Sequence, residues 1–446
     1  MAIGKKNKTR QQPMWIPYKA VMDIAGHPFY KRLNELLGQE RFDQWLEGLC
    51  EPYFRQGGRP SIPPGTYFRM LMIGYFEGLS SERAIAWRCA DSLSLREFLG
   101  LNLTERTPDH STLSVWRSRL DLAIYQEVFR KILSIVERHG LLKGEILGVD
   151  STTIEANAAM RSIVRKDTGE TYREYLAGLA RDEGIEEPTS EDLRKFDRKR
   201  KARTTSNRDF ECPVDPDSRI AKMKDGTTHL AFKAENAVDV ESSVVVSAGI
   251  FPADQGDAQT LSETIDQSLS NLQSIDSDKS IVHLVTDKGY HKASLIEQLY
   301  WEQGITTYIP ERNSPKRRKW DGNDKRCRAF HANRRRCKSE YGKWLIRQRA
   351  AIVERVFAHL MVTGGLRRIH LHGRENVQKR YLAHVFAYNL SVLMRAVSGM
   401  GSPRSSKGLK TLLRLLVLGA VMLLVLKYLL GSGGYSVRKQ IPHQGS

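Results

Sequence analysis

Three acidic residues stand at places in the sequence where their side chains could share one site. Asp150 ends an apolar run in GEILGVDSTTIEANAAM, and Asp287 ends a second one in SIVHLVTDKGY. If the two runs are neighbouring strands, both carboxylates leave the sheet at the same edge. Glu354, in RQRAAIVERVFAHLMVTGGLRR, lies beside the apolar stripe of an expected helix, from which it could reach the same point.

Carboxylates that lie close together repel each other unless one is protonated or a cation lies between them. Mg²⁺ is a hard cation that prefers oxygen ligands. We therefore expect Mg²⁺, with Mn²⁺ as the alternative, at Asp150, Asp287 and Glu354. Each acid taken alone could equally be a cap, a surface charge or one half of a local ion pair.

Three further acids are weaker candidates for such a site. Asp254 and Asp257, in FPADQGDAQT, precede an expected helix and are suited to cap its first turn. Asp239 ends the expected strand 228–239 and borders a turn. We expect all three to have structural roles.

The charge balance indicates a polyanionic partner. The 446 residues include 70 Lys and Arg against 51 Asp and Glu, a formal net charge of +19. DNA or RNA fits this excess best, through release of condensed counterions; a ribosome or an anionic membrane surface would fit it too. Charge alone leaves the chemistry open.

The five cysteines are scattered and odd in number, which argues against a disulfide framework and for a reducing compartment. Cys327, His331 and Cys337 are close enough in sequence to suggest zinc ligands, but no C-x-x-C pair accompanies them. The basic N-terminus MAIGKKNKTRQQPMW has no apolar signal-peptide core. We expect a cytoplasmic protein.

One apolar segment could contact a membrane. Residues 415–426, LLVLGAVMLLVL, lie between Arg414 and Lys427 and are shorter than the roughly 20 residues of a membrane span. A helix buried against the body or a partner is the favoured interpretation, although flanking cations can extend a short span.

The first part of the chain, 15–140, has helical periodicity, interrupted at Gly78 and Asp91. A helix start is expected in residues 107–120, TPDHSTLSVWRSRL, and Arg117 and Arg119 lie on that helix. Two short helices around a tight turn would make a helix-turn-helix DNA reader. An ordinary pair of packed helices explains the pattern equally well.

After residue 144 strands and helices alternate, which predicts an α/β fold with a mixed sheet flanked by helices. The expected strands are 146–151, 228–239, 243–251, 280–286 and 306–310. The expected helices are about 257–272, 292–303, 343–362 and 375–397. A charge-dense, mostly helical insertion, about 156–225, separates the first two strands.

A second insertion, 312–349, holds fifteen Lys or Arg against three Asp or Glu, with aromatic residues between them. Cations for phosphates and rings for bases favour a nucleic-acid surface over a merely solvated face. The candidate DNA contacts here are Arg317, Arg318, Lys319, Arg334, Arg335 and Arg336.

The ordered set GVDSTTIEAN, LVTDKGYHK and IVERVFAHL…GLRR…HGRENVQKRYLAHVFAYNL resembles the catalytic core of bacterial insertion-sequence DDE transposases. GRPSIPPGTYFRMLMIGYFEGLSSERAIAWRC, with TPDHSTLSVWRSRL, resembles the helical N-terminal domain of the same proteins. The resemblance covers about residues 15–397. It implies a ribonuclease-H-like fold preceded by an all-α domain, and it maps the family's acids to Asp150, Asp287 and Glu354.

The resemblance also implies an activity: cleavage of DNA at transposon ends with two divalent metals, and joining of the freed 3′ end to target DNA. Asp150 would bridge the two ions, and Asp287 and Glu354 would each complete one site. The implied partner is double-stranded DNA, bound by a homodimer or a larger assembly, and the implied setting is a bacterial cytoplasm, in association with the nucleoid. The competing functions are a non-catalytic helix-turn-helix regulator and a metal-dependent nuclease without strand transfer, with a membrane-anchored structural protein as a remote third.

The implied domains are a basic tail (1–14), a helical DNA-binding domain (15–140), a catalytic domain (141–397) with the two insertions, and a linker with an apolar tail (398–446).

The sequence departs from the family around the last acid. Related transposases often carry a Tyr, an Arg and a Lys at the places that Arg347, Ala350 and Met361 occupy here. DNA contacts near Glu354 are therefore assigned by hypothesis to the nearest other arginines, namely Arg349, Arg355, Arg367 and Arg368.

Overall fold

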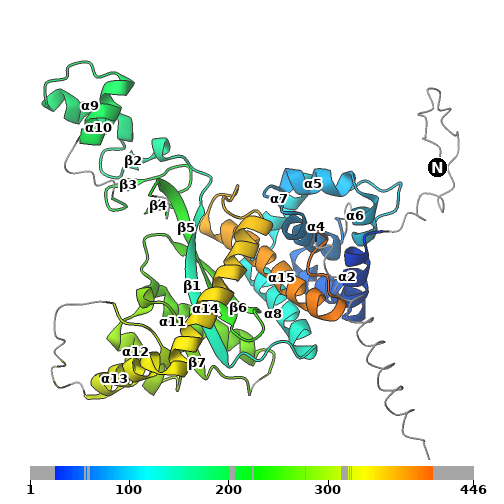
Figure 1. Ribbon diagram of the computed structural model, residues 1–446. Coiled ribbons are helices and arrows are strands. Elements are labelled where there is room, and N and C mark those ends of the chain that lie inside the picture. The colour runs from blue at the N-terminus through cyan, green and yellow to red at the C-terminus, as the bar shows by residue number, and fades with distance from the viewer. Residues whose placement is uncertain are drawn as a thin grey trace, which may run out of the picture.

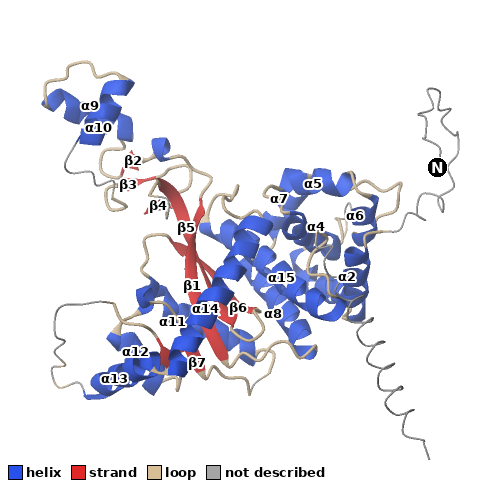
Figure 2. Ribbon diagram, in the orientation of Figure 1, coloured by secondary structure: helices blue, strands red, loops and turns tan. Residues whose placement is uncertain are grey.

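The structure, a computed structural model, describes residues 26–54, 57, 61–199, 206–223, 226–276, 278–312, 320, 322 and 324–404. A mixed sheet flanked by helices lies beside a bundle of helices (Figures 1 and 2). The helices of the bundle precede the sheet in the sequence.

The bundle is built as the sequence predicts. Its elements are α2 (Pro28–Gln39), α3 (Phe42–Cys50), η1 (Glu51–Tyr53), α4 (Pro64–Glu77), α5 (Glu82–Ala90), α6 (Leu93–Phe98), α7 (His110–Arg119) and α8 (Leu122–Arg138). Helix α4 ends because Gly78 takes a left-handed conformation, φ 68°, which costs glycine little. Helix α7 begins at Asp109, whose carboxylate accepts a hydrogen bond from the Ser111 amide.

The main sheet has the strand order β4-β5-β1-β7-β8, and β6 pairs with β5. Its strands are β1 (Ile146–Glu155), β4 (Arg219–Lys222), β5 (Thr228–Asp239), β6 (Val245–Pro252), β7 (His283–Val285) and β8 (Thr306–Tyr308). β7 is parallel to both β1 and β8, whereas β5 is antiparallel to its partners. The predicted mixed α/β sheet is confirmed.

Helices cover both faces of this sheet (Figure 2). They are α11 (Asp257–Gln273), α12 (Ala293–Trp301), α13 (Asp324–Lys338), α14 (Glu340–Ala358) and α15 (Arg374–Ser398). Because neighbouring residues of a strand point to opposite faces, β1 directs Asp150 toward α14 and Ser151 toward α11.

The first insertion forms a separate projection. It contains η2 (Met160–Ser162), the two-stranded sheet of β2 (Val164–Arg165) and β3 (Phe210–Glu211), and the helices α9 (Tyr172–Asp182) and α10 (Ser190–Lys199). The α9–α10 pair projects away from the main sheet (Figure 1) and has a small apolar cluster of its own, Leu176, Ala180 and Leu193.

One hydrophobic core runs through the bundle and the sheet. Helix α15 joins the two parts of this core, because it packs against α4 and α8 of the bundle and against β6 of the sheet. No helix in the described part of the chain is long and apolar enough to cross a membrane. The apolar segment 415–426 lies outside the described residues.

Candidate active site at the carboxyl end of β1 and β7

Asp287 lies two residues after the end of β7, whereas Asp150 lies in the middle of β1 and pairs with Asn236 of β5. β1 and β7 run parallel, and their pairing ends at Gly148 opposite Val285, so Asp150 and Asp287 each lie two residues beyond the last pair. Asp287 caps the short helix η3 (Lys288–Tyr290), and its carboxylate accepts a hydrogen bond from the Gly289 amide at 2.7 Å. The two expected strands are therefore neighbours, but the expectation that Asp150 ends its strand was wrong, because β1 continues along β5 to Glu155.

Arg349 of α14 contacts β1 on one face of the sheet. Its guanidinium donates to the carbonyl of Val149 at 2.8 and 3.0 Å and lies 2.9 Å from the Asp150 carboxylate. Arg349 is only 6% exposed, so its charge needs these oxygen partners. Gly148 leaves room for it, because a Cβ there would lie 3.0 Å from the Arg349 side chain.

Glu354 lies on the exposed side of α14, while its neighbour Val353 packs near Gly148. Five residues of an α-helix turn through about 140°, so Glu354 and Arg349 point in widely different directions. Arg349 is the α14 side chain that contacts Asp150. Two of the three predicted acids thus lie on neighbouring segments of the sheet, and the third lies on α14, which packs against β1.

The oxygen donors at this site suit a hard divalent cation. Asp150 and Asp287 come from adjacent segments of the sheet. Burial, and after it the nearby carboxylates of Glu235, Asp257 and Asp150 in that order, raise the pKa of the Tyr290 hydroxyl well above its usual range. Among the described residues, no three His, Cys, Asp or Glu side chains converge closely enough to hold a metal ion. The set Asp150, Asp287 and Glu354 stays a prediction.

Behind this site lies a buried charged pair that the sequence analysis missed. Lys233 and Glu235 of β5 point toward α11 and are 4% and 0% exposed. The signal was present in THLAFKAENAVD, where two charged residues alternate within an otherwise apolar strand. Asp257 joins this pair, with its carboxylate 2.8 Å from the Lys233 ammonium.

The capping role expected of Asp257 was wrong. The N-cap of α11 is Gly256, and Asp257 is the first helical residue. Asp254 also lies before the helix and not at its cap; its carboxylate is 3.9 Å from Arg219. Asp239 has the structural role expected of it, since it accepts hydrogen bonds from the amides of Lys143, Gly144 and Glu241 and from the Ser242 hydroxyl.

Cys327, His331 and Cys337 all lie on α13. Within the described chain they belong to no metal-binding group. The Cys337 thiol contacts the Asn333 amide oxygen, and burial raises its pKa to about 11. The cysteines are free thiols.

Two candidate DNA contacts lie on α7. Arg117 is largely buried and forms an ion pair with Glu82 of α5, so the fold itself uses its charge. Arg119 is exposed, with its guanidinium 4.8 Å from the centre of the Phe54 ring. Helix α7 follows a connection from Leu99 to Asp109, whereas the tight turn lies between α5 and α6.

The basic insertion divides into structural and exposed cations. Arg334 forms a bidentate ion pair with Glu311, and Arg336 donates a hydrogen bond to the Thr307 carbonyl at 3.1 Å. Desolvation lowers the pKa of Arg336. Arg335 is exposed, whereas Arg317, Arg318 and Lys319 lie outside the described residues.

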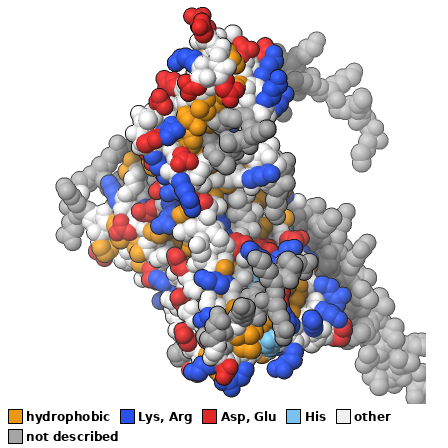
Figure 3. All heavy atoms as spheres, turned by 90° about the vertical axis from the view of Figure 1, so that its left-hand side faces the viewer, with side chains coloured by type: hydrophobic (Ala, Val, Ile, Leu, Met, Phe, Trp, Pro, Cys, Tyr) orange, Lys and Arg blue, Asp and Glu red, His pale blue; other side chains and the backbone are white. Residues whose placement is uncertain are grey.

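Arg355, Arg367 and Arg368 are exposed. Arg368 lies 3.7 Å from Glu155, at the point where the segment after α14 pairs with the end of β1. Figure 3 shows blue Lys and Arg side chains predominating at the lower end of the face it presents, and mixed charges on the upper projection.

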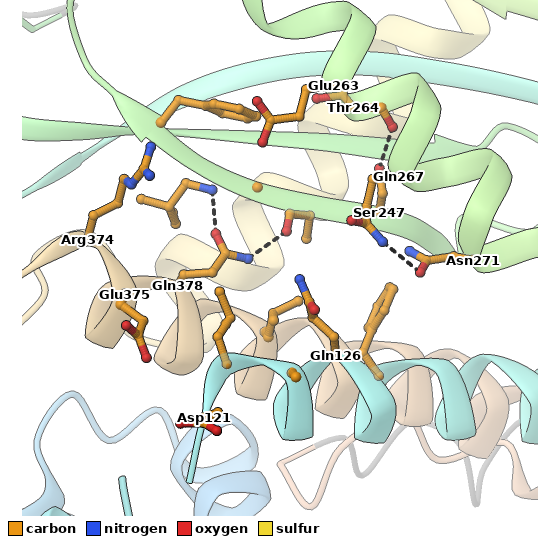
Figure 4. Close-up of a pocket in the computed structure, with 18 residues that line it drawn as sticks. Asp121, Gln126, Ser247, Glu263, Thr264, Gln267, Asn271, Arg374, Glu375 and Gln378 are labelled. Atoms are coloured by element: carbon orange, nitrogen blue, oxygen red, sulfur yellow. Dashed lines mark hydrogen bonds between the residues drawn. The ribbon is translucent and has the colours of Figure 1, made fainter. Parts of the chain in front are cut away.

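A separate cavity of about 530 Å³ lies between α8, α11, α15 and the edge of β6 (Figure 4). Gln378 points into this cavity and forms hydrogen bonds with backbone groups at the edge of β6. Its side-chain amide accepts a hydrogen bond from the Ile250 amide and donates one to the Ala248 carbonyl. The Asn271 amide donates to the Val246 carbonyl in the same way. Side-chain amides thus close an edge that could otherwise pair with another strand.

Comparison with known families assigns both halves of the chain. Residues 18–119 match the family described as transposase domain (DUF772), and residues 180–390 match the transposase DDE domain. The second match contains Asp287 and Glu354 and begins after Asp150. No curated protein and no solved structure matches the chain. Two transposase domains in this order, the second of them a DDE domain with a ribonuclease-H-like fold, place the chain in the family of insertion-sequence DDE transposases.

Proposed function

We propose that this chain binds the ends of an insertion sequence, cleaves them with divalent metal ions at Asp150, Asp287 and Glu354, and joins the freed 3′ end to target DNA. One observation carries the proposal: Asp150 and Asp287 each lie two residues beyond the last paired residues of the parallel strands β1 and β7, in a chain with a DDE transposase domain. Mg²⁺ or Mn²⁺ at these oxygens would stabilise charge on the scissile phosphate and the leaving oxygen.

The residues around the acids have distinct parts in this scheme. Asp150 and Asp287 offer oxygen ligands from neighbouring segments of the sheet. Glu354 comes from α14, which Arg349 fixes to β1 through the Val149 carbonyl. The exposed arginines, Arg119, Arg335, Arg355, Arg367 and Arg368, supply positive charge for phosphates. Because two DNA ends must be held together, we propose a dimer or a larger assembly as the active form.

The test uses the DNA that flanks the coding sequence, in Mg²⁺ and in Mn²⁺. Asp150→Asn, Asp287→Asn and Glu354→Gln should each abolish nicking and joining while leaving binding of that DNA within about threefold. Asp254→Asn, an exposed acid with only a loose contact to Arg219, is the matched control and should cleave normally.

The outcomes separate the candidate functions. Nicking that never proceeds to joining would favour a nuclease, and DNA binding without nicking would favour a regulator. Normal cleavage by any one of the three acid variants would remove that residue from the site.

A further inference from the structure

A buried network of charges lies directly behind the proposed catalytic site, on the α11 side of the sheet. The Lys233 ammonium is 2.8 Å from the Asp257 carboxylate and 3.2 Å from that of Glu235, and it donates to the Thr260 hydroxyl at 2.9 Å. The Tyr290 hydroxyl donates to Glu235 at 2.9 Å. β5, α11 and η3 therefore meet at one ammonium group and its two carboxylates.

Asp257 links this network to the two segments that carry Asp150 and Asp287. Its Oδ1 accepts a hydrogen bond at 3.0 Å from the hydroxyl of Ser151, the residue after Asp150. Its Oδ2 packs against Gly289, two residues after Asp287: a Cβ at Gly289 would lie 2.4 Å from that oxygen and 2.9 Å from Asp287 Oδ1. One carboxylate thus contacts the segments that carry both acids.

The charges at this place explain why a lysine is needed. The buried Glu235 and the partly exposed Asp257 both contact Lys233, and two further acids, Asp150 and Asp287, lie nearby. Carboxylates packed in this way repel each other unless cations are interposed. Arg349 supplies one cation, to Asp150, and Lys233 supplies another, to Asp257 and Glu235.

We propose that Asp257, held and neutralised by Lys233, is a positioning residue that fixes the separation of Asp150 and Asp287 through its contacts with Ser151 and Gly289. It acts through those neighbours, without touching DNA. This inference rests on the proposed function, because it gives Asp257 a task only if Asp150 and Asp287 hold a divalent cation together. Outer residues that orient metal ligands are commonly worth 10- to 100-fold in metal affinity.

The test measures Mn²⁺ binding to the full, DNA-free chain by electron paramagnetic resonance, together with thermal unfolding. Asp257→Asn keeps the size of the side chain and an oxygen for Ser151, but removes the charge that pairs with Lys233. We expect it to raise the dissociation constant for Mn²⁺ by about tenfold. Asp254→Asn, three residues away, should bind Mn²⁺ as the wild type does.

Two further variants keep the result decisive if Asp257→Asn folds poorly. Ser151→Ala removes only the hydroxyl that reaches Asp257, and should raise the Mn²⁺ dissociation constant severalfold with little change in the unfolding temperature. Lys233→Met should weaken Mn²⁺ binding as well. When it is combined with Asp257→Asn, the two effects should be less than additive, because both changes break the same contact.

A folded Asp257→Asn or Ser151→Ala chain with the wild-type affinity for Mn²⁺ would overturn the inference and leave the proposed function standing. Absence of both Mn²⁺ binding and DNA cleavage in the wild-type chain would overturn the two together.

Discussion

At the scale of single residues, the site is defined as much by its cations as by its acids. Arg349 and Lys233 are both nearly buried, and each contacts a carboxylate of the site: Arg349 that of Asp150, and Lys233 that of Asp257. Removing one partner of a buried pair leaves the other charge desolvated and unmatched, which costs more than the pair itself contributes. Both cations therefore have consequences for stability that an exposed arginine would not have.

Arg349→Met tests this for α14. The variant loses the bonds to the Val149 carbonyl and leaves Asp150 without its guanidinium partner, so the free energy of unfolding should fall by about 3 kcal/mol. Denaturant titration followed by circular dichroism measures the loss.

Arg347→Met is the matched control, because Arg347 is exposed on the same helix. It should change the free energy of unfolding by less than about 0.5 kcal/mol. Equal losses in the two variants would show that the contact of Arg349 with β1 contributes no more to the free energy of unfolding than an exposed arginine does.

At the scale of elements, the strands and helices were predictable where their periodicity is strong. The strand 228–239 and the helix 257–272 were placed within a residue of β5 and α11, and the breaks at Gly78 and Asp91 fall at the ends of α4 and α5. Their signals are local: an apolar pattern, a glycine, a cap. The strand that begins at residue 146 was predicted too short, because the polar residues of STTIE pair with β5 in the ladder.

The arrangement of the site was less accessible to sequence reasoning. Asp150 and Asp287 could be found because each ends an apolar run. The direction of Glu354 depends on how α14 lies over β1, and the pairing of Lys233 with Asp257 joins segments 24 positions apart in sequence across a sheet–helix interface. The place where related transposases carry a Lys is occupied by Met361, which is buried in the π-helix η4 (His359–Thr363).

Helix α15 contains an element-scale prediction about pH. His384 is fully buried, with its ring nitrogens 3.1 Å from the carbonyls of Arg380 and Gly364, and burial lowers its pKa well below the usual value. The folded chain keeps it neutral, whereas the unfolded chain takes up a proton below about pH 6.5. Its contribution to stability is therefore complete above that pH and is lost as the pH falls below it.

His384→Gln removes the titrating group. The difference in the free energy of unfolding between wild type and variant should shrink by up to about 1.4 kcal/mol for each pH unit below pH 6.5. Denaturant titrations at about pH 7.5 and pH 5.5 measure this change. A difference that stays constant over that interval would contradict the assignment.

At the scale of the whole molecule, the bundle and the sheet share a core and so should unfold together. Phe386 of α15 packs near Phe68 of α4, and Lys379 and Arg380 donate to the carbonyls of Arg117 and Leu79 in the bundle. Helix α15, the last long helix described, is thus packed against helices α4 and α8, which precede the sheet in the sequence. A family assignment by sequence separates two domains that the packing joins.

Two deletions distinguish shared from separate packing. A chain that begins at residue 141 exposes the faces of α15 that α4 and α8 cover, so it should be insoluble or lack a cooperative thermal transition.

Replacing residues 168–205 with a short Gly/Ser linker removes the α9–α10 pair, whose cluster of Leu176, Ala180 and Leu193 is separate from the main core. The flanking β2 and β3 are already paired. That chain should unfold in one calorimetric transition near the wild-type temperature. The reverse pattern, a stable sheet without the bundle and a disrupted core without the projection, would show that α15 does not unite the molecule.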